Sequence, residues 1–117
     1  MTAVRLREKL RKREIGAEEL TSFYLERIEK YNPRINAIAE LDETAIQQAR
    51  AADSYREDKT LLGLPVLVKD NIDVKGLHTT AGSLTLSDNI AREDAPVIAN
   101  LRRMGAVILG NFLYALH

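Results

Sequence analysis

The most informative segment of this 117-residue sequence is GLPVLVKDNIDV, residues 63–74. Its first part, from Leu64 to Val68, is continuously apolar and rich in β-branched side chains, and it ends abruptly at the polar run 69–71, Lys-Asp-Asn. A short continuous apolar run predicts a strand that is buried on both faces, whereas a half-exposed strand would alternate apolar and polar residues. The polar run would then follow the carboxyl end of a buried strand.

The sequence after this segment predicts a loop, a helix and a second strand. Residues 70–92 show little periodicity and contain several Gly, Ser and Thr residues, which is typical of an ordered loop with room for one short strand. We expect Asp94 to cap a helix that has Pro96 in its first turn and stops at Gly105. Residues 106–109, AVIL, predict another buried strand. This order indicates a βαβ-like unit with parallel strands.

The first sixty residues predict helices. A charged first segment is separated by Gly16 from an amphipathic stretch that we expect to end at Asn32-Pro33. After a short apolar segment, Asp42 is expected to cap a third helix with a narrow face of small residues. We therefore divide a single truncated domain into a helical amino-terminal segment, 1–60, and the first βαβ-like part of an α/β core, 61–117.

Two buried strands make too small a sheet to be stable alone, because three or more strands are usually needed. The sequence therefore predicts a fold that is interrupted in the middle of a sheet. A free sheet edge and apolar helix faces favour association, either with a second copy of the chain or with a complementary fragment.

Composition excludes several classes of function. Lys plus Arg and Asp plus Glu are equal at 17 each, so no net charge would attract nucleic acid or an anionic membrane. The sequence has no cysteine, and its two histidines, His78 and His117, have no companions at metal-ligand spacing. No apolar run approaches the roughly 18 residues of a membrane span. We predict a cytoplasmic protein without a metal site.

Lys69 is the first candidate for chemistry. Open α/β sheets bind ligands at the carboxyl ends of their strands, and burial there would favour a neutral amine that could act as a general base. The alternative is a solvated lysine paired with Asp70 or Asp73, and the residues taken by themselves favour this alternative.

An ordered series of motifs changes that balance. The sequence resembles the amidase signature family from about Leu20 to Gly110. The resemblance rests on the segment 63–74 and on five further stretches: Tyr24-Leu25-Glu26-Arg27-Ile28, Ile35-Asn36-Ala37, Thr79-Thr80-Ala81-Gly82-Ser83, Asp94-Ala95-Pro96-Val97, and Gly105-Ala106-Val107-Ile108-Leu109-Gly110.

The resemblance implies the amino-terminal helices and first strands of an α/β/α sandwich, and a cofactor-free amide hydrolase that uses a Ser, cis-Ser, Lys triad. Lys69 occupies the position of the lysine that deprotonates the bridging serine, which in turn activates the nucleophilic serine. The family's oxyanion hole consists of backbone N–H groups. Asp70 and Asn71 would orient the loop that carries the lysine.

The chain also departs from the family pattern. Both triad serines belong to a glycine- and serine-rich stretch further along, and no such stretch occurs in the 117 residues. Gly110 should be followed by Lys-Thr-Asn, whereas this sequence continues with Asn111-Phe112. We therefore expect an amino-terminal portion that is inactive by itself. Ser83 could in principle form a dyad with the lysine, but the resemblance places it in a loop near the site, and His78 is expected to be a loop histidine.

Two alternatives stay open. The glutaminase subunit of a tRNA-dependent amidotransferase shares these motifs, and the specificity-determining parts lie further along. The chain could instead be a non-catalytic module that associates with itself or complements another fragment.

Overall fold

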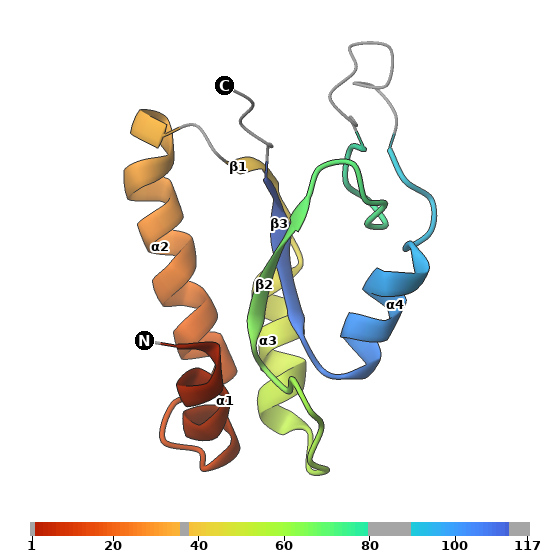
Figure 1. Ribbon diagram of the computed structural model, residues 1–117. Coiled ribbons are helices and arrows are strands. Elements are labelled where there is room, and N and C mark those ends of the chain that lie inside the picture. Colours follow the sequence, from red (N-terminus) through yellow and green to blue (C-terminus); the bar gives the residue numbers. More distant parts are fainter. Residues whose placement is uncertain (1, 36–37, 80–89, 113–117) are drawn as a thin grey trace.

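The computed structural model describes residues 2–35, 38–79 and 90–112. A small sheet lies between helices, with α2 and α3 against one face and α4 against the other (Figure 1). The elements, in chain order, are α1 (Ala3–Arg11), α2 (Ala17–Ile35), β1 (Ile38–Leu41), α3 (Ala45–Ser54), β2 (Pro65–Lys69), α4 (Pro96–Arg103) and β3 (Val107–Phe112). This is the predicted arrangement of amino-terminal helices and first strands of an α/β/α sandwich.

The described residues form a sheet of three strands in the order β1-β3-β2. β2 and β3 are parallel, with Pro65 opposite Val107 and Lys69 opposite Phe112, which confirms the predicted βαβ-like connection. β1 was not predicted; it pairs with β3 in the antiparallel direction and lies inside the segment 1–60, for which only helices were expected. Its four residues, Ile-Ala-Glu-Leu, lie in the short apolar segment before the third helix, and so short a run does not by itself distinguish a strand from a helix.

Burial differs between the two predicted strands. The central strand β3 is buried from Val107 to Asn111, as expected for a strand covered on both faces. In β2, by contrast, Val68 is the one buried residue and the others are half-buried. The prediction that β2 is buried on both faces was wrong, because β2 lies at the edge of the described sheet.

Two apolar clusters, one on each face of the sheet, form the core. Ile108 packs with Val68, Val74 and Ile98 on the α4 face. Val107 and Leu109 pack with small residues of α3, Ala45 and Ala49, on the other face. Neighbouring residues of a strand point to opposite faces, so β3 supplies both clusters. The small-residue face predicted for the third helix is confirmed.

A side chain of α3 continues the sheet where β1 ends. Gln48 accepts a hydrogen bond from the Ile108 amide at 2.8 Å and donates one to the Ile108 carbonyl at 3.2 Å. The Gln48 amide therefore takes the place of a neighbouring strand beside the first part of β3, and it satisfies two buried backbone groups.

Three predicted helix ends differ from the structure. α2 continues through Pro33 to Ile35, since a proline in the last turn removes few helical hydrogen bonds. α4 has Ala95, not Asp94, at its N-cap. Asp42 does precede the third helix and accepts hydrogen bonds from the Thr44 amide and hydroxyl, but Thr44 itself is the N-cap. None of the described helices is both long enough and apolar enough to cross a membrane.

Candidate active site

The parallel strands β2 and β3 end side by side, and Lys69 is the last residue of β2. The backbone continues beside β3 for one more residue, because the Asp70 amide donates to the Phe112 carbonyl at 3.0 Å. Asp70 is only 4% exposed and Lys69 is half-buried. The predicted lysine and its neighbouring carboxyl group therefore lie at the edge of the sheet where parallel α/β folds bind their ligands.

The loop after Lys69 begins with a tight turn. The Ile72 amide donates to the Lys69 carbonyl at 3.1 Å, and Asn71 in this turn is exposed. Asp73 accepts a hydrogen bond from the Thr79 hydroxyl through its side chain at 2.7 Å and one from the Ala95 amide through its carbonyl at 2.9 Å. These bonds hold the loop against itself and against the start of α4.

Further bonds fasten this loop to the other two strands. Glu40 of β1 accepts a hydrogen bond from the His78 amide at 2.8 Å and lies 3.0 Å from the His78 ring nitrogen Nδ1. Asn111 of β3 donates through Nδ2 to the His78 carbonyl at 3.0 Å. His78 is therefore a loop histidine, as predicted, and it connects the loop with both strands.

Asn111 is a residue that the sequence analysis did not select. It is 1% exposed, it lies opposite Val68 in the sheet, and its Oδ1 has no hydrogen-bond partner among the described residues. The available signal was a polar residue directly after the apolar run of β3. It was noted only as a departure from the family pattern.

The predicted site residues have different outcomes. The structure brings Lys69 and Asp70 together with Asn111 at the ends of β2 and β3, and it places Asn71 on the exposed side of the turn. Ser83 lies outside the described residues. Within the described part of the chain, no group of three or more His, Asp or Glu side chains could hold a metal ion.

Asp94 joins the loop to α4 rather than capping the helix. Its carboxylate accepts hydrogen bonds from the Lys75 amide and from Arg102 Nε, both at 2.8 Å. Burial raises the pKa of Asp94, but the Lys75 amide, the Arg102 hydrogen bond and the charges of Arg102 and Lys75 outweigh this effect and lower the pKa below its ordinary value.

This lowered pKa predicts a loss of stability in acid. A carboxyl group with a depressed folded-state pKa stabilises the fold above its unfolded pKa, near 3.9, and loses that effect as the pH falls through the folded pKa. We expect Asp94→Asn to cost about 1–2 kcal/mol at pH 7 because it removes a charged acceptor. Urea denaturation of both proteins from pH 7 to 3 should show the gap closing below about pH 4. A gap that stays constant over this range would contradict the assignment.

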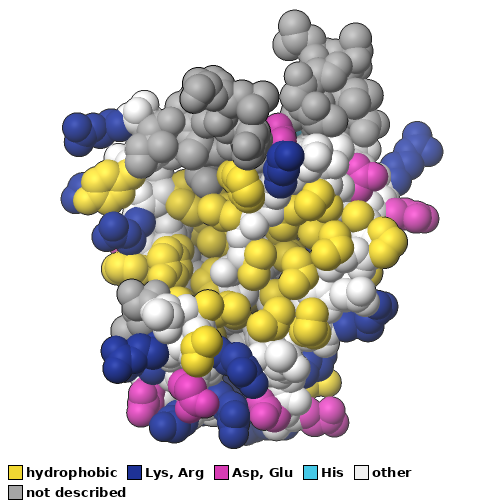
Figure 2. Space-filling model, in the orientation of Figure 1, with side chains coloured by type: hydrophobic (Ala, Val, Ile, Leu, Met, Phe, Trp, Pro, Cys, Tyr) yellow, Lys and Arg dark blue, Asp and Glu magenta, His cyan; other side chains and the backbone are white. Residues whose placement is uncertain are grey.

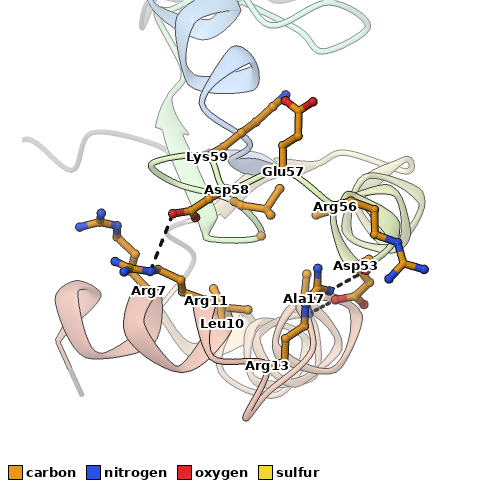
Figure 3. Close-up of a pocket in the computed structure, with 13 residues that line it drawn as sticks. Arg7, Leu10, Arg11, Arg13, Ala17, Asp53, Arg56, Glu57, Asp58 and Lys59 are labelled. Carbon is orange, nitrogen blue, oxygen red and sulfur yellow. Dashed lines mark hydrogen bonds and ion pairs between the residues drawn. The ribbon is translucent and has the colours of Figure 1, made fainter.

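A cavity of about 310 Å³ lies elsewhere, between α1, the start of α2 and residues 52–63 (Figure 3). Arg13 donates to the Asp53 carbonyl at 2.7 Å, and Arg11 lies 3.8 Å from Asp58. The Asp53 carboxylate accepts from the Ala17 amide at 2.6 Å. None of the predicted site residues lines this cavity, and these contacts join the first two helices to α3 and to the segment after it.

Known proteins match this chain over most of its length. The family model for amidases matches residues 19–112. One component of the glutamyl-tRNA(Gln) amidotransferase from Caldanaerobacter subterraneus is 41% identical over 114 residues, which cover 94% of this chain and 23% of the relative. A probable amidase from Arabidopsis thaliana is 40% identical over 112 residues, covering 90% and 22%.

Solved structures of amidases also match this chain. The crystal structure of an amidase family protein from Bacillus anthracis superposes with a TM-score of 0.85 at 34% identity, covering 96% of this chain and 24% of that one. The chain thus spans about a quarter of the length of the relatives that it matches. Because the family match extends over most of the sequence and the fold agrees with it, the chain belongs to the amidase family.

Proposed function

We propose that this chain supplies the lysine-bearing part of an amide-hydrolase active site, with Lys69 as the general base. The observation that carries the proposal is the place of Lys69 at the carboxyl end of β2, beside the buried Asp70 and the end of β3. The amidase family membership supports it. The test is to replace Lys69 in a chimeric amidase in which residues 19–112 of this chain take the place of the matching segment, and to measure amide hydrolysis.

The proposed reaction is hydrolysis of a carboxylic amide to an acid and ammonia or an amine. The amine of Lys69 takes a proton from a bridging serine, which takes one from the nucleophilic serine as that serine attacks the amide carbon. The proton returns to the leaving nitrogen when the C–N bond breaks, and water then releases the acyl group. Asp70 and Asn71 hold the turn that carries the lysine.

The substrate class is a carboxylic amide, without a narrower assignment. A relative 41% identical over 114 residues is named as part of an amidotransferase, and one 40% identical over 112 residues is named as a probable amidase, so identity favours neither name. A glutaminase role is the second candidate, because several relatives carry the amidotransferase name. A cytoplasmic location is part of the proposal and rests on the absence of cysteine from the sequence.

The chain of 117 residues is expected to be inactive alone. The mechanism needs two serines from a glycine- and serine-rich stretch of the family, and no such stretch occurs in these 117 residues. Ammonia release from simple aliphatic and aromatic amides should not exceed that of a Lys69→Ala variant. Activity in the unsubstituted chain that disappears with Lys69→Ala would contradict this expectation. Ser83→Ala would then show whether Ser83 is the nucleophile.

A further inference from the structure

Charged side chains of both signs gather at one end of the molecule, over α1 and the segment that follows α3 (Figure 2). The cavity of about 310 Å³ between α1, the start of α2 and residues 52–63 lies at this end. Small-molecule sites have volumes from roughly 300 Å³ upward, so the cavity is large enough for a small ligand.

The inner wall of this cavity is apolar and belongs to the packed core. Four residues supply its apolar side chains: Leu10, Ala17, Ala52 and Leu62. Ala17 is 2% exposed, and Leu10 and Ala52 pack against the same core cluster. Gly63 is buried beside them, and a Cβ at this position would lie 2.9 Å from the Cβ of Ala17. The wall is therefore held in place by close packing, and it offers contacts to an apolar part of a ligand.

The lining of the cavity carries more positive than negative side chains. Five basic and three acidic residues give it a net charge of +2: Arg7, Arg11, Arg13, Arg56 and Lys59 against Asp53, Glu57 and Asp58. The chain as a whole has no net charge, with 17 residues of each sign. The cavity is thus a local concentration of positive charge, which favours an anionic ligand.

Two of the three acidic side chains already have partners within the protein. The Asp53 carboxylate accepts hydrogen bonds from the Ala17 and Glu18 amides, at 2.6 and 3.0 Å. Asp58 lies 3.8 Å from Arg11. Because Asp53 satisfies the amino-terminal end of α2, an anion in the cavity would have to bind through side chains rather than through the helix dipole.

Three arginine side chains keep a positive charge that no carboxylate neutralises. Arg13 donates to the backbone carbonyls of Asp53 and Tyr55, at 2.7 and 2.9 Å, and these acceptors carry no charge. Arg7 and Arg56 form no hydrogen bond or ion pair with another described residue, and they lie on opposite sides of the cavity (Figure 3). Both are exposed, so their side chains can turn toward a bound anion.

We propose that this cavity binds a small phosphomonoester, with the organic part against the apolar wall and the phosphate among the arginines. Such a phosphate carries a charge of about −1.5 to −2 at pH 7, which matches the net charge of +2 of the lining. Guanidinium groups bind phosphate oxygens through paired hydrogen bonds. The inference does not depend on the proposed function, because the cavity adjoins the segment before β2, whereas Lys69 is the last residue of β2.

The test is an NMR titration of the isotope-labelled 117-residue chain with phenyl phosphate at constant ionic strength. Inorganic phosphate, which lacks the apolar part, and phenol, which lacks the charge, are titrated separately. The backbone amide signals of Ala17 and Gly63 report on the wall of the cavity. We expect phenyl phosphate to bind about tenfold more tightly than inorganic phosphate, because its ring contacts the wall, and phenol to give no saturable shift.

Replacing Arg7 and Arg56 together with Gln changes the net charge of the lining from +2 to 0. This double substitution is expected to weaken the binding of phenyl phosphate about tenfold or more. Arg92→Gln is the matched control, because Arg92 is an exposed arginine that does not line the cavity, and its affinity should stay within about twofold. Lys69→Met should also bind normally, which separates this test from that of the proposed function.

Circular dichroism of each variant shows first whether its helices are retained. If the double variant does not fold, Arg7→Gln and Arg56→Gln are measured singly, and each should weaken binding about threefold. The proposal would be overturned by the absence of saturable binding, by equal affinity for phenyl phosphate and inorganic phosphate, or by unchanged affinity in the Arg7 and Arg56 variants. Signal shifts spread over basic residues outside the cavity would overturn it as well.

Discussion

Replacing Lys69 with Met is expected to reduce amide hydrolysis about a thousandfold in a chimera in which residues 19–112 replace the matching segment of an active amidase. Methionine keeps most of the length and apolar contacts of the lysine stem but cannot take a proton. The serine would then have to ionise without a base, so the loss should appear mainly in kcat, with little change in KM. Steady-state ammonia release by the two chimeras measures it.

Lys75→Met is the matched control for this experiment. Lys75 lies in the same loop and is exposed. Its backbone amide donates the hydrogen bond to Asp94, so this bond does not depend on the lysine side chain. We expect the Lys75→Met chimera to stay within about twofold of the unsubstituted one, as for a surface substitution. A Lys69→Met chimera that retained most of its activity would remove Lys69 from the catalytic machinery.

The position of Lys69 could be predicted because it depends on local sequence. A continuous apolar run that ends in a charged residue predicts a strand and its carboxyl end, and the parallel pairing of β2 and β3 followed from the helix between them. The resemblance then supplied a role for the lysine that burial and spacing alone did not favour.

The contacts that fasten the loop could not be predicted, because they join residues far apart in the sequence. Glu40 holds His78, and Gln48 bonds to the backbone of Ile108 across 60 residues. Each of these polar residues is consistent with an exposed helix or strand position when only its neighbours are considered. Their partners become evident only when the tertiary fold is known.

The assignment of Asp94 as a helix cap failed for a related reason. An Asp two residues before a helical proline matches the local pattern of an N-terminus. In the structure, the Lys75 amide and the Arg102 guanidinium offer the carboxylate two charge-assisted bonds, which are stronger than a single capping bond. A tertiary interaction therefore replaced the local one.

Gly110→Ala is expected to destabilise the chain by about 3 kcal/mol, because β1 passes too close to this glycine for any side chain. A Cβ at position 110 would overlap the carbonyl oxygen of Glu40 and lie 2.8 Å from the Leu41 Cα. Both neighbours are backbone atoms of a paired strand, so β1 and β3 would have to separate. Urea denaturation followed by circular dichroism, at matched protein concentration, measures the change.

Gly76→Ala distinguishes this steric effect from the general cost of replacing a glycine. Gly76 has a φ of +86°, but a Cβ there would meet nothing within 4 Å, so its replacement should cost only about 1 kcal/mol of backbone strain. Equal losses of stability at the two positions would contradict the close approach of β1.

If Gly110→Ala destabilises the chain more than Gly76→Ala does, we expect the candidate site to be disturbed as well. The new methyl group would displace the backbone of Glu40, and the side chain of Glu40 accepts the hydrogen bond from the His78 amide. In the chimera, Gly110→Ala would then lower amide hydrolysis as well as stability, although Gly110 lies opposite Leu67 and not opposite Lys69.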